Sequence, residues 1–93
     1  MRLTLVAFAS PDRAARPWLE PDYVADLLYG AARPEELVEH VSASCGPGHV
    51  IVGFHTRHAP TDTGVTAILT GLVERALSTR PELAAWSVPA KAL

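Results

Sequence analysis

The fold of this chain is decided by the sequence LVEHVSASCGPGHVIVGFHTR, residues 37–57. Two apolar runs flank Gly46-Pro47-Gly48, a combination that predicts a β-hairpin closed by a tight turn. Because side chains alternate between the faces of a strand, loop length determines which residues share a face. A loop of two or four residues gathers the apolar residues of both strands on one face: Val41, Ala43, Cys45, Val50, Val52 and Phe54. A three-residue loop would mix apolar with polar residues, so burial favours the even loop.

The second face of this hairpin carries two adjacent histidines, and the candidate chemistry is expected there. It places His40 beside His55, with Ser42 and Ser44 further along the same strand. Towards the open end of the hairpin, the same register pairs Glu39 with Thr56 and Val38 with Arg57.

The remaining elements are expected on either side of the hairpin. Residues 2–9 are almost continuously apolar, as in a central strand covered on both faces. Pro21 suits the first turn of a helix over residues 21–30. A second helix over 62–79 carries an apolar stripe with helical spacing: Val65, Ile68, Leu69, Leu72, Val73, Ala76 and Leu77. A short edge strand is expected over 85–88, while residues 35–40 fit either a strand or an extended helix.

This order of elements predicts one α+β domain over residues 1–93, with the ferredoxin-like split βαβ arrangement βαββαβ. The hairpin strands are expected over about 37–45 and 49–57. Right-handed crossovers place both helices on one face of an antiparallel four-stranded sheet. The first and third strands are then central, and the second and fourth form the edges.

Composition excludes several classes of function. The chain has 93 residues, a net charge of −2 and a single Lys, which opposes nucleic-acid binding. A single cysteine, Cys45, excludes an intrachain disulfide and a multi-cysteine metal site, and no cofactor is expected. Residues 3–9 are too short an apolar run for a signal peptide or a membrane span, so we expect a cytoplasmic protein without a membrane partner.

The sheet face turned away from the helices is the expected interface. If Leu3, Leu5 and Ala7 face the helices, then Val6 and Phe8 join Ile51 on the opposite face. An exposed apolar patch of this kind typically marks an interface, and two-fold homodimers are common. A homodimer through this face is therefore expected. The alternative is that residues 13–20, with Trp18, cover the patch within one chain.

His40 and His55 are the candidate catalytic residues, and Arg57, Phe8, Ile51 and Trp18 are the candidate ligand-binding residues. Neighbouring imidazoles could serve as a general acid and base, with Arg57 orienting an anionic substrate. The alternative is an ordinary pair of surface histidines on a half-exposed strand. A zinc or copper site with Glu39 or Asp62 as a further ligand is a third interpretation, but the spacing matches no metal motif, so no metal is expected. Cys45 is expected on the core face as a small apolar residue.

Residues 18–36 and 59–86 resemble short actinobacterial proteins to which no activity is assigned. That resemblance transfers no role to any residue. Two functions stay open: a small dimeric accessory protein that binds a small molecule or a peptide, and a cofactor-independent enzyme of the dimeric α/β-barrel type. A single-stranded nucleic-acid binder is disfavoured, because the patch lacks basic residues among its aromatics.

Overall fold

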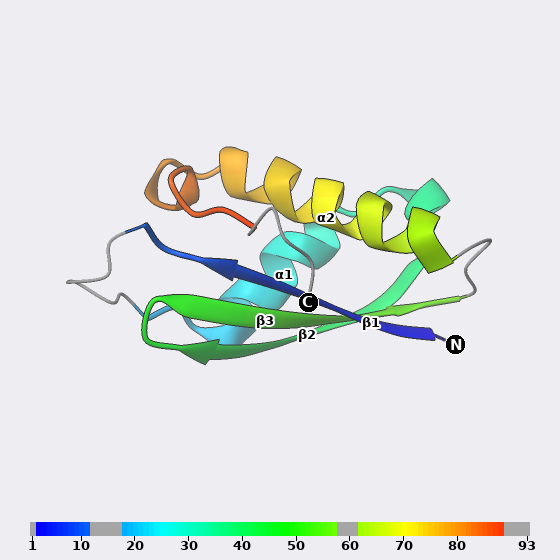
Figure 1. The fold of residues 1–93 in the computed structure, drawn as a ribbon, viewed down its shortest axis with the longest axis horizontal. Coiled ribbons are helices and arrows are strands. Elements are labelled where there is room, and N and C mark those ends of the chain that lie inside the picture. The colour runs from blue at the N-terminus through cyan, green and yellow to red at the C-terminus, as the bar shows by residue number, and fades with distance from the viewer. Residues whose placement is uncertain (1, 12–17, 58–61, 89–93) are drawn as a thin grey trace.

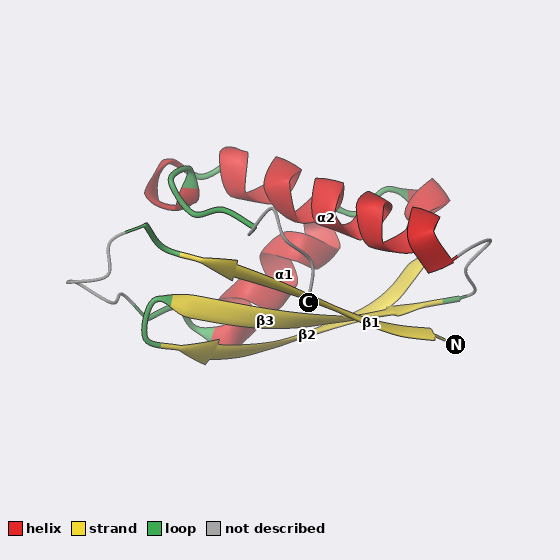
Figure 2. Ribbon diagram, viewed as in Figure 1, coloured by secondary structure: helices red, strands yellow, loops and turns green. Residues whose placement is uncertain are grey.

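The computed structural model describes residues 2–11, 18–57 and 62–88 of the chain. Its elements are β1 (Arg2–Ala9), α1 (Pro21–Ala31), a 3₁₀ turn η1 (Pro34–Glu36), β2 (Val38–Gly46), β3 (His49–Thr56), α2 (Asp62–Ser78) and a second 3₁₀ turn η2 (Pro81–Leu83). The strands form a three-stranded antiparallel sheet in the order β1-β3-β2. Both helices lie on the same side of this sheet, so the molecule has two layers (Figures 1 and 2). The fold is therefore α+β, as the sequence predicts.

The β2–β3 hairpin has the even loop. Pro47 and Gly48 form the turn, and Gly46 pairs with His49 at its base. Gly48 has a φ of 73°, a left-handed conformation that glycine adopts without steric cost. Cys45 pairs with Val50, Val41 with Phe54, and His40 with His55, so the predicted register is confirmed from the turn to the two histidines.

The predicted register is wrong beyond His40. Val38, not Glu39, lies opposite Thr56, because the ladder shifts by one residue between Val38 and His40. One extra residue on a strand of this kind is a β-bulge. Glu39 is left exposed, and Val38 packs against the core. The open alternative for residues 35–40 is also resolved, since a short 3₁₀ turn at Pro34–Glu36 precedes the strand.

The predicted orientation of β1 is wrong. Val6 lies opposite Val52, and Phe8 lies opposite Val50, so both side chains point towards the helices. Phe8 is 1% exposed, and its ring meets that of Trp86 edge to face, with 5.8 Å between ring centroids. Leu3 and Leu5 therefore lie on the face that the helices leave uncovered. An almost continuously apolar strand gives no alternation from which its orientation can be predicted.

The predicted fourth strand is reduced to a single bridge. Ser87 and Ala9 exchange two backbone hydrogen bonds of 3.0 Å in an antiparallel bridge on the free side of β1. Residues 85–88 form no strand, because Pro81–Leu83 makes a 3₁₀ turn and Trp86 turns inward, where it is 7% exposed. The predicted sheet of four strands is thus wrong for the described part of the chain, which has three.

The core lies between the sheet and the two helices. From α1 it takes Val24 and Leu28, and from α2 it takes nearly all of the predicted stripe: Val65, Leu69, Leu72, Val73, Ala76 and Leu77. Ile68 is the exception at 43% exposed, so its predicted place in the core is wrong. Among the described residues, no helix is long and apolar enough to cross a membrane.

Candidate functional site

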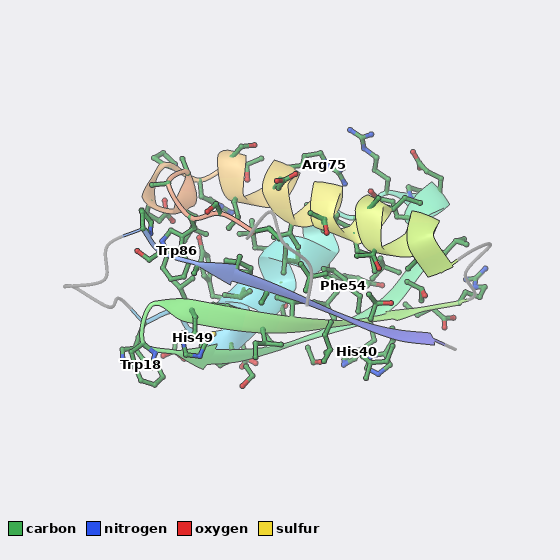
Figure 3. The ribbon with its side chains drawn as sticks, in the orientation of Figure 1. Trp18, His40, His49, Phe54, Arg75 and Trp86 are labelled. Carbon is green, nitrogen blue, oxygen red and sulfur yellow. The ribbon has the colours of Figure 1, made fainter. Side chains whose placement is uncertain are left out.

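The side of the sheet without helices, here called the open face, collects the candidate residues. Strand alternation and the pairing of the three strands give it these members: Leu3, Leu5, Ala7, Ala9, His40, Ser42, Ser44, Gly46, His49, Ile51, Gly53 and His55. Figure 3 shows the alternation directly, since His40 points below the sheet and Phe54 points up towards the helices.

The open face has an apolar part centred on β1. Leu3 is 55% exposed, Leu5 is 64% exposed, and Ile51 on the neighbouring strand is 43% exposed. Gly53 lies beneath them, because a Cβ atom there would come within 3.2 Å of a Leu3 methyl and 3.6 Å of a Leu5 methyl. The two leucines thus lean over the glycine of the central strand, and an apolar surface faces outward. Leu3 and Leu5 are the residues that the sequence-based prediction missed.

His40 and His55 meet at one end of the open face, and His49 lies at the other end. The ring centroids of His40 and His55 lie 5.5 Å apart, with the rings tilted by 45°. His40 is exposed, whereas Nδ1 of His55 is buried and has no hydrogen-bond partner in the structure. Leu3 is the cross-strand neighbour of His55 on its other side. Any proton transfer or ligand contact at His55 would therefore fall to Nε2.

Arg57 lies beside a carboxylate at the edge of the open face, with its side chain 69% exposed. Its Nε lies 3.5 Å from a carboxylate oxygen of Glu39, and its backbone N–H donates to the carbonyl of Leu37 at 2.9 Å. Glu39 is the extra residue of the bulge, and the bulge places it beside Arg57. The pair neutralises this end of the open face. No described side chain among the other members of the face carries a fixed charge.

The other predicted site residues are dispersed. Phe8 is buried in the core, so its predicted place in a ligand site on the open face is wrong. Trp18 is 66% exposed and does not cover the leucines, and residues 13–17 of the expected cover lie outside the described residues. Cys45 is on the core face as predicted, and partial burial, followed by the nearby Glu20 carboxylate, raises the pKa of its thiol. A raised pKa disfavours the reactive thiolate.

The described residues contain no group of three or more His, Cys, Asp or Glu side chains that could hold a metal ion. The His40–His55 pair thus stands without a third ligand in that part of the chain. The side chain of Asp62, weighed as a ligand in the sequence, lies outside the described residues.

Comparison with known proteins finds no matching family model, no matching curated protein and no matching solved structure. The function is therefore argued from the geometry of the open face.

Proposed function

We propose that this protein is a small homodimeric binding module that associates through its open face. The observation that carries the proposal is the exposure of Leu3, Leu5 and Ile51 together on one uncovered side of a sheet. Contiguous apolar surface of this kind favours an interface over contact with water. No iron–sulfur or other cofactor is part of this proposal.

A second copy of this chain is the partner that the face fits best. A two-fold interface brings a surface against itself, so a fixed charge at its centre would meet a like charge. The described side chains of the open face avoid this conflict, because Arg57 and Glu39 neutralise one another at its end. Gly53, at the centre of the face, is buried beneath Leu3 and Leu5, so the leucine side chains form the surface that a second copy would meet.

We propose further that the domain has the ferredoxin-like arrangement. The strand order β1-β3-β2 with both helices on one side agrees with the split βαβ pattern. The bridge between Ala9 and Ser87 lies on the free side of β1, where the fourth strand of that pattern belongs. Domains with this arrangement can pair sheet to sheet and enclose a cavity, which is the setting that the accessory and enzyme hypotheses share.

The experiment that tests the dimer introduces a charge on the open face. Leu5→Glu should give a monomer in sedimentation equilibrium at tens of micromolar, with an unchanged circular dichroism spectrum, because Leu5 lies outside the core. Thr66→Glu is the matched control, since Thr66 is exposed on α2 and should leave the dimer intact. A wild-type protein that is monomeric at this concentration, or a Leu5→Glu variant that stays dimeric, would rule the proposal out.

The second candidate function is a cofactor-independent enzyme that uses the histidine pair. The observation that favours it is the 5.5 Å contact of the two rings beside an apolar surface. His40 and His55 would act as acid and base on a substrate enclosed by the dimer. Arg57, 69% exposed and only 3.5 Å from Glu39, would orient an anionic substrate as the sequence predicts, with the nearby carboxylate offsetting part of its charge. Loss of turnover in both His40→Gln and His55→Gln, with the dimer retained, distinguishes it from simple binding.

A further inference from the structure

A cavity opens at the end of the molecule where α2 begins, on the helix side of the sheet. Its volume is about 70 Å³, and it lies between η1, the end of β3 and the first turns of α2. Most of its wall is apolar: Leu37, Val65, Ile68 and Leu69. Ile68 is the stripe residue that the core does not bury, and its exposed position places it at the rim. The cavity is separate from the open face.

One buried hydroxyl stands in the wall of this cavity. Thr56 is 2% exposed, and its Oγ1 has no hydrogen-bond partner in the structure. Thr4, one strand away on the same side of the sheet, has a second buried hydroxyl without a partner. Buried polar atoms in native proteins are nearly always paired. An unpaired hydroxyl that borders a cavity therefore indicates that something polar binds there.

Leu37 adds an independent sign of a built site. It has a φ of 61°, the only positive φ of a non-glycine residue in the described chain. Two backbone hydrogen bonds hold it in place: its N–H donates to the carbonyl of Pro34 at 3.2 Å, and its carbonyl accepts from Arg57 at 2.9 Å. Residues kept in such unfavourable conformations concentrate at ligand sites. Here the strained residue forms part of the cavity wall.

The charges around the cavity restrict what can enter. Both Glu35 and Glu36 line it, and of these two carboxylates the ion pair with Arg75 compensates only Glu36, so the remaining charge of Glu35 would repel an anion. Arg75 holds the Glu36 carboxylate at 3.0 Å, and the backbone N–H of Arg33 donates to it at 2.6 Å. Because Glu36 is already engaged, Thr56 is left as the buried group that can form a hydrogen bond with a ligand.

We propose that this cavity binds a short aliphatic chain that carries a neutral hydroxyl group. The chain would pack against Leu37, Val65 and Leu69, and its hydroxyl would hydrogen-bond to Thr56 Oγ1. An apolar cavity of roughly 150 Å³ accepts benzene, so the smaller volume here suits about four non-hydrogen atoms. Such a ligand could be a free alcohol or the end of a larger molecule that reaches in past Ile68.

The test titrates the protein with 1-propanol and follows methyl groups by NMR. We expect saturable shifts at Val65, Leu69 and Thr56, with a dissociation constant in roughly the millimolar range that so small a ligand can reach. Methyl groups of Leu5 and Ile51 report on the open face and should not move in parallel. Propionate has nearly the same shape but is an anion, and it should not produce the shifts.

Two substitutions test the hydrogen bond from the ligand to Thr56 and the free volume of the cavity. Thr56→Val keeps the shape of the side chain, removes the hydroxyl and should weaken binding about fivefold or more. Thr66→Val, on the exposed side of α2, is the matched control and should bind as the wild type does. Should Thr56→Val fail to fold, Val65→Ile provides the second route, because its added methyl group takes up part of the cavity and should weaken the binding of 1-propanol; unchanged affinity in this variant would also overturn the proposal.

Three outcomes would overturn the proposal. The first is no saturable shift at the cavity methyl groups, which would mean that the cavity holds only water. The second is unchanged affinity in Thr56→Val or in Val65→Ile. The third is propionate binding as tightly as 1-propanol.

Discussion

The two faces of the sheet are made by the same three strands, yet one face is buried and the other is exposed. The helix side holds Val6, Phe8 and Phe54 at 5% exposed or less, whereas Leu3 and Leu5 on the open face are more than half exposed. Apolarity alone does not decide this outcome, because Thr4 is turned inward and Leu5 outward. Pairing with the hairpin determines which side chains of β1 are buried. Because Phe54 and Val52 of β3 point towards the helices, their partners on β1 must point the same way.

The largest expected difference between the faces is in the cost of removing a side chain. Phe54→Ala should lower the free energy of unfolding by about 3–5 kcal/mol, because it leaves a cavity in a close-packed core. Ile51→Ala, three residues earlier on the same strand but on the open face, should cost less than about 1 kcal/mol. Urea denaturation at a concentration that keeps the protein monomeric measures both. Similar losses for the two variants would contradict the assignment of the faces.

Two ion pairs, one on each side of the sheet, are expected to differ in their contribution to stability by an intermediate amount. Arg75 and Glu36 tie α2 to η1, with side chains 30% and 8% exposed, and Arg75 also donates to the carbonyl of Ala31 at 2.9 Å. Arg75→Met should therefore cost about 1–3 kcal/mol, since it leaves a nearly buried carboxylate without its cation.

The control for this pair lies at the edge of the open face. Arg57 and Glu39 are 69% and 37% exposed, and Arg57→Met should change stability by less than about 0.5 kcal/mol. Thermal unfolding of the two variants in parallel gives the comparison. If Arg57→Met were the more damaging substitution, the pair at the bulge would have a structural role that its exposure does not explain.

The smallest effect concerns a polar contact of the helix layer. The Tyr23 hydroxyl donates to Glu82 at 3.0 Å. The backbone N–H of Glu82 and then this phenol hold the pKa of the Glu82 carboxyl below its ordinary value, whereas partial burial and then Glu82 raise the pKa of Tyr23. A carboxyl with a lowered pKa stabilises the fold above its unfolded-state pKa, near 4.3, and this stabilisation is lost as the pH falls through the folded-state value.

Tyr23→Phe should accordingly make stability slightly less sensitive to acidification below about pH 4.3. Denaturant titrations between neutral pH and pH 3 would reveal the change. Tyr29→Phe is the control, because Tyr29 is 55% exposed on the same helix. An identical acid response in the wild type and Tyr23→Phe would show that the phenol contributes nothing measurable to the Glu82 carboxyl.

The predictable part of this fold is the part in which apolar and polar residues alternate. The hairpin could be predicted in register, including the contact of His40 with His55, because only the even loop separates its apolar residues from its polar ones. The stripe of α2 could be predicted for the same reason, with a period of 3.6 residues in place of two. Ile68 departs from it because it lies beside the cavity, where nothing in the described chain covers it.

The unpredictable part is where the sequence carries no alternation. After Arg2, Thr4 is the only polar residue of β1, and it points to the wrong orientation because its hydroxyl is buried without a partner. For this reason the sequence places Phe8 on the open face and gives no sign of Leu3 and Leu5 there. The pairing of Val6 with Val52 determines the orientation of β1 and therefore the positions of Phe8, Leu3 and Leu5. This pairing joins distant parts of the chain, so the local sequence does not reveal it.

The bulge at Glu39 divides β2 into two segments in which opposite residue parities face the core. From His40 onward the even-numbered residues lie on the open face, whereas before Glu39 the even-numbered Val38 faces the core. The switch is what lets Val38 reach the core while His40 stays opposite His55. Glu39 is thus a spacer of one residue, and the chain could lose it without inverting a single side chain in the sheet. In evolutionary terms, this is the position in β2 at which a one-codon deletion leaves both faces of the sheet in phase.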